Sequence, residues 1–277
     1  MTECPLIILT NDDGIDSPGL AAAAAALDPL GELVIIAPAR QQTSMGRSRS
    51  SQHQSDSNFS RHDVAYNGKH WEGFAVDASP AVTLELGLHA LLKRPAALVV
   101  SGINYGENVG SCVTISGTIG AALEAADYGL KTMAVSLEIN SSDYHSYDQD
   151  VDFETAAAFT RMFARSLLLA ELPPDVDVLK IEIPAAATIN TPWIVSRQDR
   201  IPYYKAGVLA EGNQERIPTL RHFPRKGEYY AAGTDAFALA DGVVSITPLS
   251  LDMTSRVSLD QLKNKIMEGI AEDENQC

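Results

Sequence analysis

The chain has 277 residues, of which 45% are hydrophobic, and it carries a formal net charge of −15. This length allows one large domain or two modest ones. The negative charge argues against a DNA or RNA duplex, or an anionic membrane, as the partner, because such partners need a basic surface. The net negative charge does not exclude a nucleotide-sized ligand that is held in a local site.

The cysteines and the termini indicate where the protein works. Cys4, Cys112 and Cys277 show no CxxC or metal-type spacing, which is typical of a reducing compartment. The chain opens with no basic-then-apolar leader and contains no apolar run long enough to span a membrane. We therefore expect a soluble, cytoplasmic protein with no membrane partner.

In the first two thirds of the chain, apolar runs alternate with patterns of helical spacing. The runs predict strands over 5–10, 32–38, 97–104, 132–139 and 178–184, and the helical patterns fall over 17–30, 79–93, 116–130 and 151–170. Strands that are apolar throughout and separated by helices favour an α/β fold, with a mostly parallel sheet covered on both faces. The six alanines at 21–26 predict a small-residue helix face packed close to that sheet.

Other stretches carry turn and loop signals. Residues 46–63 are polar and Ser-rich, so we predict a loop. Asn67-Gly68 predicts a β-hairpin over 64–74. From about 190 to 235 the chain is rich in aromatic and basic residues and lacks helical spacing, which suggests an extended, hairpin-like arm on a single domain of residues 1–277.

The end of the chain returns to regular structure. A strand is predicted over 242–249, followed by a closing helix over 258–270 with Ser258 as its N-cap.

Two adjacent acids, Asp12 and Asp13, stand one residue after the first predicted strand. Taken alone, the pair has even odds of being a turn and helix cap. Both acids can be ionised together only beside positive charge, which a divalent cation would supply. Mg²⁺ and Ca²⁺ prefer oxygen ligands, and Thr43 or Ser44 offers a hydroxyl while Asn104 offers an amide carbonyl.

A second group stands at the start of the predicted helix over 116–130. Ser116, Gly117 and Thr118 would form an ordinary cap, but free amides and hydroxyls at a helix start also bind anions such as phosphate. Loops that follow parallel strands meet at one edge of the sheet, where ligands bind. A cation beside a phosphate pocket indicates phosphoryl chemistry, in which a metal polarises a phosphoryl oxygen or activates a water.

Several segments together resemble the SurE (survival protein E) family. In chain order they are "ILTNDDGIDSPGL", "IIAPARQQTSMGRS", "VVSGINYGENVG", "TISGTIGAALEA" and "GTDAFALADGVVSITPL". The similarity runs from about residue 6 to 250, and the ordered combination is far more specific than any single segment. Members of this family are metal-dependent phosphatases of nucleoside monophosphates, built on a three-layer, Rossmann-like α/β body.

The resemblance implies a set of metal ligands. Carried over by position, these are Asp12, Asp13, Thr43 and Asn104, with Ser44 as the alternative hydroxyl. The implied cofactor is one divalent cation per subunit, Mg²⁺ or Mn²⁺ before Ca²⁺ or Co²⁺. Asp12 and Asp13 are also the implied catalytic residues, because one of them, or metal-bound hydroxide, would receive the proton of the attacking water.

The resemblance further implies how substrate and subunits are held. Phosphate contacts fall on Ser116, Gly117 and Thr118, and Asn108 is a further contact. Family members form dimers or tetramers through an extended C-terminal arm, which suggests a homodimer or homotetramer here.

The chain also departs from the family pattern at positions that bear on substrate preference. Ala39 replaces an acid, Arg47 stands where a histidine is common, and "ASPAVTL" and "ISGT" replace "GTPxDCV" and "YSGT". None of these changes removes an implied metal ligand.

The resulting hypothesis is a metal-dependent 5′-nucleotidase that hydrolyses a ribonucleoside 5′-monophosphate to nucleoside and phosphate. An extension of this activity to 3′-monophosphates is left open. The alternative is a non-catalytic, nucleotide-binding regulatory module on the same fold. A third interpretation, a phosphatase with an aspartyl-phosphate intermediate, usually needs a DxD spacing that Asp12-Asp13 lacks.

Overall fold

The computed structural model describes residues 4–49, 59–139, 151–209, 219–224 and 229–274. A nine-stranded sheet with the order β3-β4-β2-β1-β5-β6-β7-β11-β8 forms its centre. The strands of this sheet are β1 (Leu6–Thr10), β2 (Glu32–Pro38), β3 (Ser60–Tyr66), β4 (Lys69–Val76), β5 (Leu98–Tyr105), β6 (Thr132–Leu137), β7 (Val178–Ile183), β8 (Trp193–Val195) and β11 (Val244–Leu249). Neighbouring strands run parallel except for β3 with β4 and β7 with β11.

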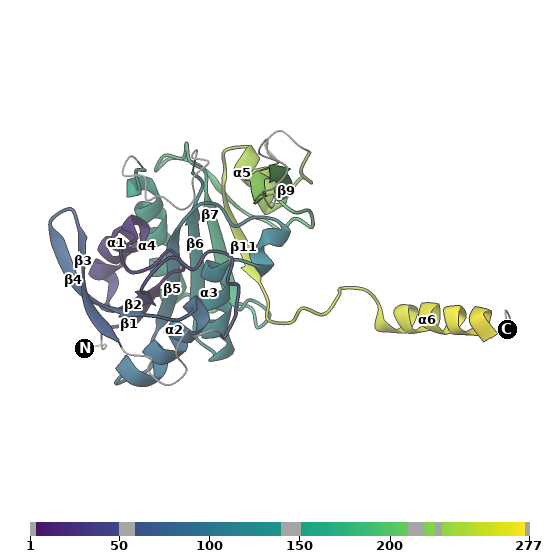
Figure 1. The fold of residues 1–277 in the computed structure, drawn as a ribbon, viewed down its shortest axis with the longest axis horizontal. Coiled ribbons are helices and arrows are strands. Elements are labelled where there is room, and N and C mark those ends of the chain that lie inside the picture. The colour runs from purple at the N-terminus through teal and green to yellow at the C-terminus, as the bar shows by residue number, and fades with distance from the viewer. Residues whose placement is uncertain (1–3, 50–58, 140–150, 210–218, 225–228, 275–277) are drawn as a thin grey trace.

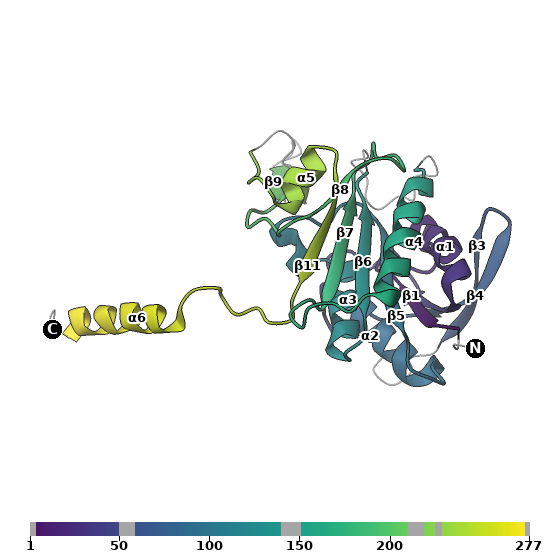
Figure 2. The same ribbon diagram turned by 180° about the vertical axis from the view of Figure 1, so that it is seen from behind.

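Helices cover both faces of the sheet (Figures 1 and 2). On one face α1 (Pro18–Leu27) packs beside α4 (Glu154–Leu169), and on the other α2 (Pro80–Leu86) packs beside α3 (Gly117–Asp127). Short helical turns follow or precede these helices: η1 (Asp28–Leu30), η2 (Gly87–Leu91) and η3 (Ser111–Thr114). The predicted α/β fold, with a mostly parallel sheet covered on both faces, is confirmed.

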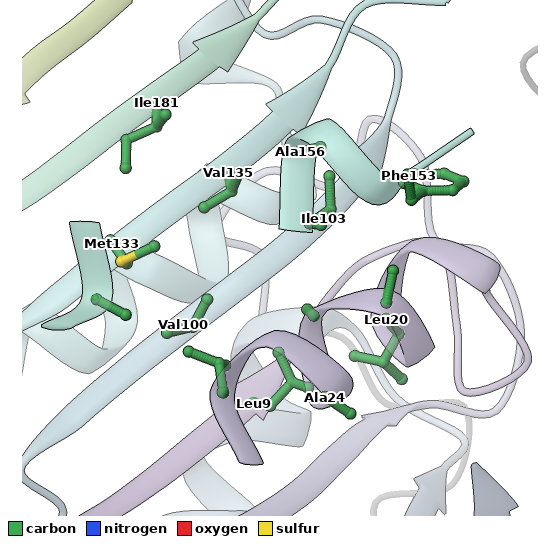
Figure 3. Packing of buried hydrophobic residues seen from close by; sticks show 14 of the residues in the cluster. Leu9, Leu20, Ala24, Val100, Ile103, Met133, Val135, Phe153, Ala156 and Ile181 are labelled. Atoms are coloured by element: carbon green, nitrogen blue, oxygen red, sulfur yellow. The ribbon is translucent and has the colours of Figure 1, made fainter. Parts of the chain in front are cut away.

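The larger hydrophobic core lies between the sheet and the α1–α4 layer. Figure 3 shows Leu9, Val100 and Val135, from β1, β5 and β6, on the side of the sheet where Leu20 and Ala24 of α1 pack. All five side chains are fully buried. This packing fixes the strand ends on which the candidate site is built.

The alanine-rich helix packs as its composition predicts. Ala22, Ala23 and Ala24 are completely buried. The helix lies so close to β5 that a Cβ on Gly19 would come within 2.0 Å of the Ile103 carbonyl oxygen. Small side chains are therefore what allows α1 to reach the sheet, and the predicted small-residue face is confirmed.

The hairpin at one edge of the sheet is longer than predicted. Asn67 and Gly68 form its turn with φ of 48° and 79°, which confirms the turn. The predicted loop over 46–63 is wrong at its end, because residues 60–63 already belong to β3. These polar residues lack strand-like alternation, and their pairing with β4 fixes them as a strand instead. Residues 50–58 lie outside the described part.

The predicted helix over 79–93 ends earlier as an α-helix. α2 stops at Leu86 and continues as a π-helical turn, η2, over Gly87–Leu91. Gly87 lies against β2, where an added Cβ would come within 2.9 Å of Ile36 Cγ2. The chain therefore changes from α-helix to π-helix at the point where Gly87 lies close to the sheet.

The C-terminal third departs most from the alternation of parallel strands and helices seen in the rest of the chain. β9 (Tyr204–Leu209) and β10 (Thr219–Pro224) form a separate antiparallel hairpin within the predicted arm, while β8, from the same stretch, joins the edge of the main sheet. α5 (Asp235–Ala240) leads into β11. α6 (Leu259–Glu274) begins after Ser258, whose Oγ accepts from the Gln261 amide at 3.4 Å.

Helix α6 extends away from the body of the protein in both views (Figures 1 and 2). The predicted closing helix is therefore present, but it does not close against the sheet. Among the residues that the structure describes, no helix is both long and apolar enough to cross a membrane.

Candidate functional site

The paired acids lie in a tight turn at the carboxyl end of β1. Asn11 makes this turn, since its Nδ2 donates to the Gly14 carbonyl at 3.0 Å and its Oδ1 accepts from the Gly14 amide at 3.1 Å. Asp12 and Asp13 are 4% and 2% exposed. Asn11 therefore holds the turn through its own side chain, and the carboxylates of Asp12 and Asp13 are directed to other segments.

Each acid faces a different neighbouring segment. Asp12 Oδ1 accepts from the Thr118 hydroxyl, and the main-chain amides of Gly117 and Thr118 also donate to this carboxylate. Asp13 Oδ2 accepts from the Tyr105 amide at 2.8 Å, and its Oδ1 accepts from Gln41 Nε2 at 3.3 Å. The loops after β1, β2 and β5 and the start of α3 therefore meet at one place, as the strand-end argument predicts.

Burial makes this pair of acids reluctant to ionise. Loss of hydration raises the pKa of Asp12 to about 6, although its hydrogen bonds at the start of α3 lower it in part. The pKa of Asp13 is raised well above its ordinary value, first by burial and then by the negative charge of Asp12. A cation at this place would relieve both effects.

The anion at the start of α3 is Asp12 itself. Ser116 caps the helix, with its Oγ accepting from the Ile119 amide at 3.2 Å. Gly117 is required by close contact, because an added Cβ would lie 2.7 Å from both Cβ and Oδ2 of Asp12. The sequence predicted an anion site here, and the carboxylate of Asp12 is one anion that accepts from its donors.

Asn104 comes from the irregular end of β5. The register of β5 against β6 shifts between Ser101 and Asn104, which is the kind of irregularity that re-aims a side chain. Asn104 Nδ2 donates to the Gly106 carbonyl at 2.6 Å, so its amide oxygen is the atom available as a ligand. The main-chain amide of the next residue, Tyr105, donates to Asp13. Asn104 is thus the chain neighbour of a residue that is bonded to the acid pair.

Thr43 and Ser44 are both exposed, in a loop that is fixed beside the pair. The Gln42 amide donates to the main-chain oxygen of Asp12 at 2.7 Å. Ser44 has a φ of 63°, in the left-handed region. Thr43 thus follows directly on a residue that is bonded to the turn of the acids.

Two arginines fix the far end of this loop, which sequence reasoning missed. Arg47 Nε and Arg49 Nη2 lie 2.6 and 2.8 Å from the fully buried carboxylate of Glu124 on α3. The Gly46 amide also donates to the Ile115 carbonyl at 2.9 Å. The loop after β2 is therefore held against the same helix whose start receives Asp12.

The oxygen-rich character of the site suits a hard cation. Within the described ranges, no three or more His, Cys, Asp and Glu side chains are grouped so as to hold a metal ion. A metal beside Asp12 and Asp13 would rest on two carboxylates with amide and hydroxyl oxygens, which is a donor set for Mg²⁺ or Mn²⁺ and not for structural Zn²⁺.

Asn108 lies farther along the loop after β5, and buried charges surround its main chain. Its Nδ2 donates to Ser136 Oγ at 3.1 Å. Its amide and carbonyl bind Glu182 and Lys180 of β7, both of which sequence reasoning passed over. The signal was present in "VLKIEIP", where two charged residues alternate with apolar ones in an otherwise buried strand.

Comparisons with known proteins identify the family of the chain. The model of the family described as "Survival protein SurE" matches residues 7–203 of the chain. The chain belongs to the SurE family. The family resemblance of the signature segments is thereby confirmed.

Relatives in the SurE family match nearly the whole chain. The 5′-nucleotidase SurE of Archaeoglobus fulgidus is 38% identical over 265 residues, covering 92% of this chain and 94% of that protein. The 5′-nucleotidase SurE of Thermococcus gammatolerans is 36% identical over 263 residues, covering 93% and 94%. The crystal structure of the SurE protein from Aquifex aeolicus superposes with a TM-score of 0.73 at 29% identity, covering 98% of this chain and 100% of that one.

Proposed function

We propose that this protein is a divalent-metal-dependent 5′-nucleotidase, which hydrolyses a nucleoside 5′-monophosphate to nucleoside and inorganic phosphate. The observation that carries the proposal is the pair of adjacent, buried carboxylates, Asp12 and Asp13, brought against the start of α3. The relatives named 5′-nucleotidase SurE support the same activity. Activity toward 3′-monophosphates is the finer part of this proposal.

We assign the metal to Asp12, Asp13 and Asn104, together with the hydroxyl of Thr43 or Ser44. Support comes from the raised pKa of both acids, which a bound cation would lower again by stabilising their charged forms. When bound, Mg²⁺ or Mn²⁺ supplies a Lewis acid for a phosphate oxygen and lowers the pKa of a water. The chain's own acids would hold the cation and accept the proton of the attacking water.

We assign the substrate phosphate to the start of α3, beside Asp12, with Ser116, Gly117, Thr118 and Asn108 as contacts. The positive end of the helix acts on any anion placed near it and is not exhausted by one carboxylate. In the transition state these donors would stabilise the charge that develops on the phosphoryl oxygens.

Release of inorganic phosphate from a panel of nucleoside monophosphates, with Mg²⁺, Mn²⁺, Ca²⁺ or Co²⁺ and with EDTA, tests the proposal. Asp13→Asn is expected to lower this release by roughly 10³-fold or more, because several kcal/mol of charge stabilisation is lost with the ligand. The matched control is Asp16→Asn, an exposed acid nearby that binds His62, and it should keep full activity.

Full activity of Asp13→Asn would contradict the assignment. No phosphate release by the wild-type chain with any metal, together with retained nucleotide binding, would instead identify the non-catalytic regulatory module.

We also infer a homodimer or homotetramer. Support comes from exposed apolar side chains on the edge strand β8, where Trp193 and Val195 are 50% and 67% exposed, and on α6, where Leu259 is 64% exposed. A solution mass equal to one chain, measured by light scattering, would refute this inference.

A further inference from the structure

Beneath the loop after β5 lies a cluster of charged side chains, Lys180, Glu182 and Asp235, that the proposed chemistry does not use. All three side chains are completely buried. Lys180 and Glu182 are two residues apart on β7, so they project from the same face of the strand. Asp235 is the first residue of α5. Buried charges of this kind are costly, which calls for a reason why they are placed there.

The cluster binds the main chain on both sides of Asn108. Glu182 Oε2 accepts from the Asn108 amide at 3.0 Å, and Lys180 Nζ donates to the Asn108 carbonyl at 3.0 Å. Asp235 Oδ2 accepts from Lys180 Nζ at 2.9 Å and from the Gly110 amide at 3.2 Å. The loop is thereby fixed at three main-chain groups by side chains from two other elements.

The side chain of Asn108 is held separately. Its Nδ2 donates to Ser136 Oγ on β6, and Ser136 is completely buried. With the main chain fixed by β7 and α5 and the side chain fixed by β6, Asn108 has its orientation set by three elements of the fold.

Such a cluster gives a single loop conformation at a cost in stability. Burial raises the pKa of Glu182 to about 7, although Lys180 and the Asn108 amide act to lower it. In a buried network every group left without a partner is penalised, so alternative positions of the loop are strongly disfavoured.

We propose that Lys180, Glu182 and Asp235 are positioning residues, which fix the loop of residues 106–110 so that Asn108 can contact the substrate phosphate. This inference rests on the proposed function, since it gives Asn108 its role there. The three residues do not touch the reacting atoms. They act through the main chain of the loop, and their effect should appear mainly in phosphate affinity.

The decisive variants alter Glu182 in two ways. Glu182→Leu removes the acceptor for the Asn108 amide, and we expect KM for adenosine 5′-monophosphate to rise roughly 10-fold in the Mn²⁺-saturated full-length protein, with kcat changed less than about threefold. Glu182→Gln keeps an acceptor oxygen and should rescue KM to within about twofold of wild type.

Lys131→Met is the matched control. Lys131 Nζ also donates to main-chain oxygens, those of Leu167 and Ala170, but at the opposite end of the sheet. This variant should keep its KM. If Glu182→Leu does not fold, Asp235→Asn decides instead, because it weakens the bonds that Asp235 Oδ2 accepts from Lys180 Nζ and the Gly110 amide and should also raise KM several-fold.

Two measurements separate this inference from the proposed function. Calorimetric titration of inorganic phosphate into the Mn²⁺-loaded protein should show roughly 10-fold weaker binding for Glu182→Leu, and amide hydrogen exchange of residues 106–110 should speed up in the same variant. Both readouts are independent of turnover. A wild-type chain that releases no phosphate from any nucleotide would overturn the proposed function alone.

The positioning role would be overturned by unchanged phosphate affinity and unchanged KM in the folded Glu182→Leu variant, or in Asp235→Asn where that variant replaces it. Equal losses in Glu182→Leu, Glu182→Gln and Lys131→Met would also overturn it, because they would reveal a general effect on stability.

Discussion

Two of the clusters of buried acids, Asp12 with Asp13 and Glu182 with Asp235, differ in the groups that face their carboxylates. Asp12 and Asp13 lie side by side, and neutral hydroxyl and amide groups donate to them. Glu182 and Asp235 share a buried lysine, Lys180, within 3.5 and 2.9 Å. The Lys180 cluster contains its own positive charge, and we propose that a divalent cation binds at Asp12 and Asp13.

The direction of the pKa shifts does not distinguish the two clusters, because burial raises the pKa in both. Burial raises the pKa of Asp12 to about 6 and that of Glu182 to about 7. For Glu182 a fixed lysine offsets part of the effect, while Asp235 and Glu107 add to it. For Asp13 the neighbouring acid adds to it. Lys180 thus offsets part of the cost of the structural cluster, and we propose that a bound cation supplies positive charge at the candidate active site.

The largest expected effect comes from removing the internal cation. Lys180→Met leaves Glu182 and Asp235 buried without their counter-charge, and we expect the free energy of unfolding to fall by about 3–5 kcal/mol at pH 7.5. Urea unfolding measures this loss. Lys131→Met, which deletes main-chain hydrogen bonds but leaves no carboxylate behind, should lose only about 1 kcal/mol. An equal loss of unfolding free energy in Lys180→Met and Lys131→Met would show that Lys180 does not act as the counter-charge of the two buried acids.

The next effect is a dependence of stability on pH that belongs to the structural cluster. The folded protein raises the pKa of Glu182 from 4.5 to about 7, so it binds this proton more tightly than the unfolded chain does. The stabilising contribution is complete below pH 4.5 and is lost as the pH rises through about 7. Glu182→Gln should therefore be more stable than wild type above pH 7.5, by on the order of 3 kcal/mol, and not below pH 4.5.

Urea unfolding of both proteins across this range of pH provides the measurement. A stability difference that stays constant from pH 4 to pH 8.5 would show that the proton on Glu182 does not contribute.

The smallest effect concerns the divalent cation that we propose for Asp12 and Asp13. Mn²⁺ at about 100 times its dissociation constant should stabilise the wild-type fold by about 2.7 kcal/mol, because it binds the folded state alone. Asp13→Asn should lose this gain, while Glu182→Gln, whose cluster already has its cation, should keep it. Thermal unfolding with and without Mn²⁺ measures the difference. The same gain in Asp13→Asn would place the cation elsewhere.

Much of the site followed from local sequence patterns. The position of Asp12 and Asp13 directly after an apolar run, and of Ser116 to Thr118 at a helix start, placed them at element ends before any contact was known. Because parallel strands present their carboxyl ends at one edge, their convergence could be predicted as well. The bonds of Tyr105 and Thr118 to the two acids confirm that convergence.

Other features could not be predicted from such patterns. Asp235 and Lys180 are 55 residues apart, and only the pairing of β7 with β11 and the start of α5 bring them together. The pairing of Arg47 and Arg49 with Glu124 likewise joins segments separated by more than 70 residues. No periodicity in a single segment reports such contacts.

The sequence by itself determined the α/β class, the order of the main elements and the acids at the end of β1, because these depend on local spacing and on the fixed geometry of parallel strands. Only the tertiary structure decided which charges are paired. It placed Asp12 against the start of α3, and it bonded Lys180 and Glu182 to the main chain of Asn108. The physical reason is that the charge state of a buried acid depends on neighbours that the fold, and not the adjacent sequence, supplies.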